Sequence, residues 1–121
     1  MKVIGIIGSR RRDNPEDYDQ LEEAFFQIYK DGDEIVSGGC PKGGDNFAET
    51  IAKKHQIPIK IYYAQWKKRG KAAGFIRNTD IANDADVLIA LVADDRTGGT
   101  EDTIKKAEKQ NKSIIILSTP K

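Results

Sequence analysis

Short apolar runs alternate with helical patterns through the whole chain, and this alternation constrains the fold more than any other feature. Most of the runs are rich in Ile and Val without polar alternation, which is typical of strands covered on both faces. The runs are Val3–Ile7, Glu34–Val36, Ile57–Tyr62, Val87–Val92 and Ser113–Leu117. The helical patterns cover about Pro15–Lys30, Asn46–His55 and Ala72–Asn83, and a last one begins at Thr100.

Strands that alternate with helices are joined by right-handed crossovers into a parallel sheet with helices on both faces. We therefore predict a three-layer, Rossmann-like α/β fold with five parallel strands in the order 3-2-1-4-5. The 121 residues suit one domain that covers residues 1–121. Such sheets bind ligands beyond the carboxyl ends of their strands, at the switch point between strands 1 and 4.

The start of the first helical pattern is the clearest. Asn14 is a good N-cap, and Pro15 stands at the first helical position. The acidic residues that follow, Glu16 and Asp17, complement the helix dipole.

Composition excludes several classes of protein. Lys and Arg number 20 against 19 Asp and Glu, a formal net charge of +1, which argues against nucleic acid as a partner. Cys40 is the only cysteine, so no intrachain disulfide is expected and the chain reads as cytoplasmic. No apolar run approaches the roughly 18 residues of a membrane span. We see no metal-ligating constellation and expect no cofactor.

The loop after the first strand carries hydrogen-bonding groups suited to an anion. Gly8 allows a tight turn out of the strand, and Ser9 supplies a hydroxyl. Arg10 can form a bidentate pair with a phosphate or carboxylate. The alternative is a solvated basic turn, which is the interpretation we favour for Arg11 and Arg12.

Four glycines lie in the stretch Ser37–Asn46, which follows the second strand. Gly38-Gly39 leave the strand and Gly43-Gly44 enter the next helix, where backbone can approach a ligand closely and free N–H groups suit an anion. The spacing matches neither the dinucleotide fingerprint nor the P-loop. Asp45 either accepts a hydrogen bond from a ribose hydroxyl or serves as the N-cap of that helix.

Trp66 and Arg77 stand out after the third strand. Trp66, the only tryptophan, either stacks on a base or covers the edge of the core. In a helix, Arg77 shares a face with Ala73 and Gly74, and small residues beside a guanidinium suit close approach of a ligand. The alternative is tight helix packing with a surface ion pair to Asp80.

A second glycine-rich loop, Gly98-Gly99-Thr100, runs from the fourth strand into a helix. It offers N–H groups and a hydroxyl to phosphate, and Thr100 can also be the N-cap. Two glycine-rich helix starts and a Ser-Arg turn thus fall on one predicted sheet edge, which indicates an anionic, nucleotide-like ligand.

These loops together resemble the SLOG superfamily, a Rossmann-like group that includes the cytokinin-activating phosphoribohydrolases ("lonely guy" proteins, often labelled lysine decarboxylases) and the DNA-processing protein DprA. Within that group the chain is most similar to the YspA-like branch, a bacterial and phage family of unknown function. The matching pieces are Gly8-Ser9-Arg10, Ser37-Gly38-Gly39 with Gly43-Gly44-Asp45, Ala64-x-Trp66, Gly70–Gly74 with Arg77-Asn78, and Gly98-Gly99-Thr100.

The resemblance implies a nucleotide-derived ligand held by the two glycine loops. By the resemblance, Gly38, Gly39, Gly98, Gly99 and Thr100 line a phosphate site, and Arg77 faces it. The resemblance also favours a homo-oligomer.

The enzymes of the group carry a longer signature, P-G-G-x-G-T-x-x-E, whose glutamate takes part in cleaving an N-glycosidic bond. Here the proline is missing and the position three after Thr100 is Thr103, while Glu101 and Asp102 are out of register.

Two main hypotheses follow. The first is a binding module for a nucleotide-derived or sugar-phosphate ligand, as a sensor or sequestering protein. The second is a phosphoribohydrolase that acts on nucleoside monophosphates, with Asp45 or Glu101 as catalytic candidates and Arg10 and Arg77 as anchors of the 5′-phosphate. Single-strand nucleic-acid binding, by analogy with DprA, is a third hypothesis, which the near-neutral charge disfavours.

Overall fold

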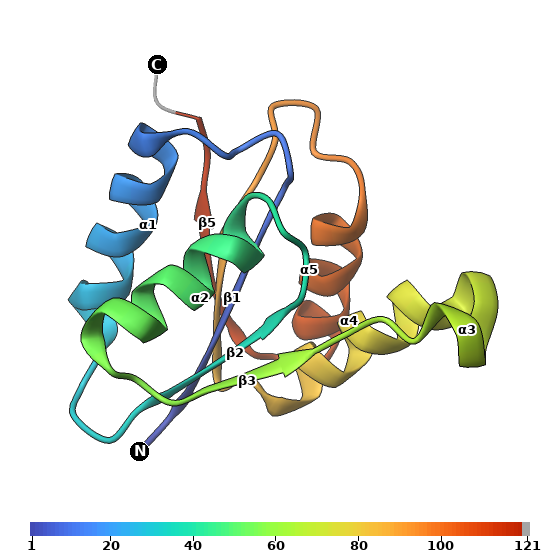
Figure 1. The fold of residues 1–121 in the computed structure, drawn as a ribbon, viewed down its shortest axis with the longest axis horizontal. Helices are drawn as coiled ribbons and strands as arrows, with labels where there is room; N and C mark the ends of the chain where they lie inside the picture. The colour runs from blue at the N-terminus through green and yellow to red at the C-terminus, as the bar shows by residue number, and fades with distance from the viewer. Residues whose placement is uncertain (120–121) are drawn as a thin grey trace.

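The computed structural model describes residues 1–119 and contains one five-stranded sheet (Figure 1). The strand order is β3-β2-β1-β4-β5, and all four neighbouring pairs are parallel, which confirms the predicted fold class and topology. The strands are β1 (Val3–Gly8), β2 (Glu34–Gly38), β3 (Ile59–Tyr62), β4 (Val87–Leu91) and β5 (Ser113–Leu117). The helices are α1 (Pro15–Ile28), α2 (Gly44–His55), α3 (Trp66–Arg69), the 3-10 turn η1 (Gly70–Ala72), α4 (Ala73–Asp84) and α5 (Gly99–Lys109).

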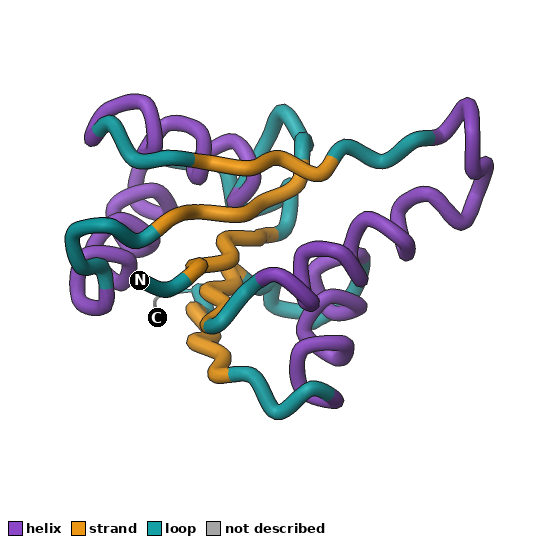
Figure 2. The backbone as a smooth tube through the Cα atoms, turned by 90° about the horizontal axis from the view of Figure 1, so that it is seen from below, coloured by secondary structure: helices purple, strands orange, loops and turns teal. Residues whose placement is uncertain are grey.

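The structure differs from the expected elements most clearly at β3 and directly after it. Strand β3 begins at Ile59 and not at Ile57, because the N–H of Ile57 bonds to the carbonyl of Ala52 and still belongs to the end of α2. The short helix α3 was not predicted. It continues from β3 away from the rest of the molecule in both views (Figures 1 and 2).

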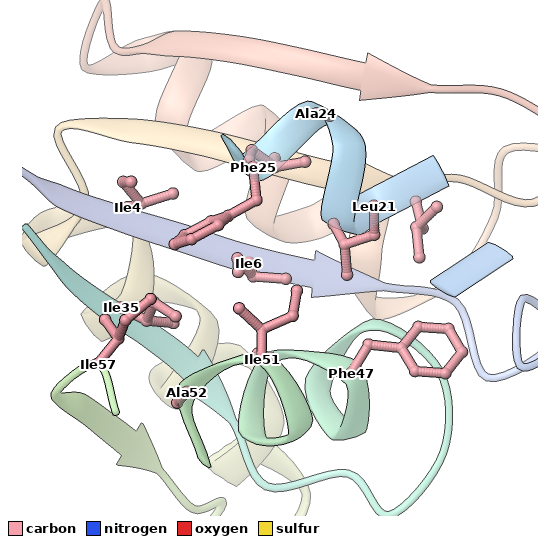
Figure 3. Close-up of a cluster of buried hydrophobic side chains, with 13 residues drawn as sticks. Ile4, Ile6, Leu21, Ala24, Phe25, Ile35, Phe47, Ile51, Ala52 and Ile57 are labelled. Carbon is pink, nitrogen blue, oxygen red and sulfur yellow. The ribbon is translucent and has the colours of Figure 1, made fainter. Parts of the chain in front are cut away.

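The helices cover the two faces of the sheet (Figure 2). On one face, Ile4 and Ile6 of β1 pack with Leu21 and Phe25 of α1 and Ile51 of α2 (Figure 3). The other face is formed by β-strand residues that alternate with these and pack against α4 and α5. That cluster includes Ile7, Val36, Leu88, Ala90, Ile81 and Ile104. The central strands are therefore covered on both faces, whereas the edge strands β3 and β5 are only half-buried.

Helix α1 starts as its sequence predicts. The Asn14 side chain accepts a 2.8 Å hydrogen bond from the N–H of Asp17, and the Asp17 carboxylate accepts one of 3.4 Å from the N–H of Asn14. This reciprocal capping box satisfies two N–H groups that the first turn leaves without helical partners.

Arg12 is buried, so the expectation of a solvated side chain was wrong. Its Nε donates to Asp17 at 2.8 Å, and its Nη1 donates to the carbonyls of Val92 and Leu117, both at 2.8 Å. A guanidinium can be buried when a carboxylate and carbonyls satisfy its donors. Arg12 thereby fixes the loop after β1 to the carboxyl ends of β4 and β5.

The same loop is fixed at a second point, because Asp13 accepts a 2.7 Å hydrogen bond from the N–H of Gly43 at the start of α2.

Among the described residues, no helix is long and apolar enough to cross a membrane.

Candidate functional site

A cavity of about 450 Å³ opens at the carboxyl ends of β1 and β4, the switch point that the topology predicts. This volume lies within the range of small-molecule sites. Its wall comes from the end of β1, the loops after β1, β2 and β4, the first turns of α2 and α5, and one side of α4. The lining residues are Ile7, Gly8, Ser9, Arg10, Arg11, Cys40, Asp45, Arg77, Asn78, Ile81, Thr97, Gly98, Gly99, Thr100 and Thr103.

The structure brings many of the predicted site residues into this one wall. Those that line the cavity are Gly8, Ser9, Arg10, Asp45, Arg77, Asn78, Gly98, Gly99 and Thr100. Those that do not line it are Ser37, Gly38, Gly39, Gly43, Gly44, Trp66 and Glu101. The loop after β4 therefore faces the cavity with its glycines, whereas the loop after β2 faces it with Cys40 and Asp45.

Two guanidinium groups in the wall have no carboxylate partner among residues 1–119. Arg10 is exposed, and Arg77 is half-buried with its Nε donating to the Asn78 side chain at 3.0 Å. The surface ion pair that we considered between Arg77 and Asp80 does not form. Arg11, in contrast, pairs with Asp95 through two hydrogen bonds of 2.9 and 2.6 Å. The free positive charge of the site thus belongs to Arg10 and Arg77.

The amino terminus of α5 forms the wall facing α4. Its N-cap is Gly98, with φ of 96° and no side-chain cap, so Thr100 is not the N-cap. A side chain of α4 holds the first turn of α5. Asn78 Nδ2 donates to the Gly99 carbonyl at 3.3 Å and to Asp102 at 3.1 Å. The first N–H groups of α5 are therefore free of a side-chain cap and can receive an anion.

Asp45 does not cap α2, since the N-cap of that helix is Gly43. Its buried carboxylate turns back toward the β2–α2 loop, where it accepts hydrogen bonds of 3.2 Å from the N–H of Cys40 and from the Ser37 hydroxyl. Burial raises the pKa of Asp45, although these hydrogen bonds and the nearby charge of Arg77 oppose the rise.

The Ser37 hydroxyl lies between two acceptors. This hydroxyl lies within hydrogen-bonding distance of both the Ile6 carbonyl and the Asp45 carboxyl. It has one proton and can satisfy only one of these acceptors at a time. Donation to Asp45 favours the charged carboxylate and opposes the rise in its pKa.

The glycines of the β2–α2 loop make room for the protein's own atoms. A methyl group on Gly44 would lie 2.4 Å from the Gly8 nitrogen and 2.5 Å from the carbonyl carbon of Ile7. On Gly43, which has φ of 74°, it would lie 2.3 Å from the Ser9 carbonyl oxygen. These two glycines therefore allow α2 to begin directly against β1.

Gly38 and Gly39 accommodate side chains in the same way. A methyl group on Gly39 would lie 2.2 Å from the Tyr63 ring, and one on Gly38 would lie 2.7 Å from both Arg77 Nη1 and Asp45 Oδ2. The ring and the two charged groups occupy the space beside these glycines that was expected for a ligand.

Glu101 and Trp66 lie outside the cavity. The Glu101 carboxylate accepts hydrogen bonds of 2.8 and 2.9 Å from Arg96. Trp66 is 59% exposed on α3, and its ring lies near Gly74. Asp45 is thus the one catalytic candidate that reaches the cavity.

Sequence reasoning missed Thr97 and Thr103 as lining residues. Thr103 is buried at the position where the enzyme signature has its glutamate, and its hydroxyl donates to the Gly99 carbonyl at 3.2 Å. The signal in the sequence was the spacing of four residues between Gly99 and Thr103, at which a Thr hydroxyl in a helix can bond to the carbonyl one turn earlier.

Within residues 1–119, no three His, Cys, Asp or Glu side chains gather closely enough to hold a metal ion. Comparison of the chain with protein-family models, with curated proteins and with solved structures gave no match. The cavity and its residues therefore carry the functional assignment.

Proposed function

We propose that the protein is a SLOG-type binding domain that holds a nucleotide-derived or sugar-phosphate ligand in the cavity between the loops after β1 and β4. One observation carries the proposal. Two guanidinium groups without carboxylate partners, those of Arg10 and Arg77, share a cavity of about 450 Å³ with the uncapped amino terminus of α5.

This combination fits a phosphate dianion. Guanidinium groups fork onto phosphate oxygens, and the first turn of a helix adds N–H donors and a partial positive charge. The Arg11 charge is compensated by Asp95, so it adds little to the attraction. Burial raises the pKa of Asp45, which favours its neutral form beside a phosphate.

The remaining wall fits a hydroxylated group attached to the phosphate. The hydroxyls of Ser9, Thr97 and Thr100 line the cavity with the Asp45 carboxyl, and such groups exchange hydrogen bonds with sugar hydroxyls. The ligand class that results is a sugar phosphate or a nucleotide.

The proposal is tested by calorimetric titration of the protein with ribose 5-phosphate and with nucleoside monophosphates. Arg10→Gln and Arg77→Gln should each weaken binding by about tenfold or more, the loss expected for a charge-assisted hydrogen bond. Arg96→Gln is the matched control, because its guanidinium is paired with Glu101 outside the cavity. The proposal fails if a broad panel of nucleotides and sugar phosphates neither binds nor raises the melting temperature.

Asp45 supports a second candidate, a phosphoribohydrolase that cleaves the N-glycosidic bond of nucleoside monophosphates. In that reaction water adds to C1′ of the ribose, and the departing base takes up a proton. A buried carboxyl with a raised pKa can hold that proton before transfer. Free base should then appear on incubation with a monophosphate, and Asp45→Asn should abolish its release. Binding without release by the wild type excludes this candidate.

A further inference from the structure

A second cavity, of about 200 Å³, lies at the carboxyl end of β3, next to the first. Its wall is formed by the end of β3, the loop that follows and one side of α4. Arg77 lines both cavities, so a ligand whose phosphate reaches Arg77 from the first cavity has the second within its reach. We infer that this second cavity binds the base of the nucleotide, an inference that rests on the proposed function.

The wall combines apolar surface with polar side chains. Ile61, Tyr63 and Ile76 supply ring and aliphatic surface, which suits the face of a planar base. Gln65, Arg69 and Asp80 supply polar side chains at the same cavity. The structure gives none of these three side chains a hydrogen bond or an ion pair within residues 1–119.

The charges distinguish a base from other occupants. A phosphate dianion could pair with Arg69 but has no donor for the Asp80 carboxylate, and a purely apolar group would leave three polar side chains without partners. A base offers N–H donors to the carboxylate and ring acceptors to Arg69 and Gln65.

The carboxylate further selects among bases. An exocyclic amino group, as in adenine, cytosine or guanine, donates to Asp80. Uracil flanks its N–H with two carbonyl oxygens, which a carboxylate repels. The site therefore prefers a nucleotide whose base carries an amino group.

The experiment measures dissociation constants for ribose 5-phosphate, UMP, AMP, CMP and GMP by calorimetry. At least one of AMP, CMP and GMP should bind the wild type about tenfold or more tightly than ribose 5-phosphate and UMP. Asp80→Asn should weaken that nucleotide by about tenfold and leave ribose 5-phosphate unchanged. Gln65→Ala, at an exposed position outside α4, should lower the same selectivity.

Asp31→Asn is the control, because it removes the same charge from an exposed turn before β2, at the amino ends of the strands and so far from the cavity. Equal affinity of the wild type for all five compounds, or unchanged selectivity in both Asp80→Asn and Gln65→Ala, would overturn the inference and leave the phosphate site standing. Failure of all five compounds to bind would overturn the proposed function and this inference with it.

Discussion

Asp45 and Arg77 approach the same side of Gly38 without forming an ion pair. A methyl group on Gly38 would lie 2.7 Å from Asp45 Oδ2 and 2.7 Å from Arg77 Nη1, yet no contact of 4.0 Å or less joins the two charged groups. Arg77 therefore stays free for a ligand while its charge acts on the carboxyl. Gly38, which has no side chain, leaves room for both groups.

The raised pKa of Asp45 should appear in the pH dependence of stability. Its folded pKa lies above its unfolded one, so the wild type loses stability as the pH rises from about 4 through the folded pKa. Asp45→Asn has no proton to lose. The melting temperature of the variant minus that of the wild type should therefore increase with pH, as circular dichroism can follow. A difference that shrinks as the pH rises contradicts the assignment, and Asp31→Asn controls for the lost charge.

Arg12 and Arg11 are neighbours in sequence, but their substitutions should change stability by very different amounts. Arg12→Ala leaves the Asp17 charge and two carbonyls without their buried partner, and should lower the free energy of unfolding by about 3–5 kcal/mol. Arg11→Ala removes only an exposed pair with Asp95 and should change stability little. Urea denaturation of the two variants measures the contrast. Equal losses would show that Arg12 does not hold the loop.

The fold was predictable because each central strand is a short apolar run between helical patterns with clear start signals. The switch point then followed from topology alone. What sequence could not decide was which side chains of a loop turn inward. Arg10, Arg11 and Arg12 are identical in type, and the acceptors that bury Arg12 lie 80 and 105 positions away in the chain.

The glycines were ambiguous for a related reason. A glycine required by a ligand and a glycine required by neighbouring backbone look the same in sequence. Gly98 adopts positive φ and has open space around it, whereas Gly44 adjoins the backbone of β1. Only the packing of α2 on β1 separates the two cases.

Gly44→Ala should therefore be strongly destabilising. The added methyl would meet Gly8 and Ile7 backbone, which cannot move without disturbing the centre of the sheet, and a loss of about 3 kcal/mol is expected. Gly70→Ala is the matched control: it has φ of 58° and nothing within 4 Å, so only backbone strain of about 1 kcal/mol applies. Chemical denaturation compares the two, and similar losses would contradict the close approach of α2 to β1.

Asp33 should give the protein part of its stability against acid. Burial alone would raise the pKa of Asp33, but hydrogen bonds from the Lys2 side chain and from the N–H groups of Lys2 and Lys30, with the Lys2 charge, lower it to about 2. This depressed pKa stabilises the fold above about pH 4 and is lost as the pH falls toward 2.

Asp33→Asn should accordingly melt below the wild type near neutral pH, and the gap should close as the pH falls toward 2. Thermal melts across this range measure it. A gap that widens in acid, or one that Asp31→Asn reproduces, would show that the Asp33 contacts do not contribute.

The anchoring of the loop after β1 has a kinetic consequence. Arg12 binds the ends of β4 and β5, and Asp13 accepts from Gly43, while the exposed Arg10 side chain is left to move. The backbone around the cavity is thus in place before a ligand arrives. Association should proceed in one step, at a rate set by diffusion and charge and not by loop closure. Differences in affinity between ligands should then appear in their dissociation rate constants.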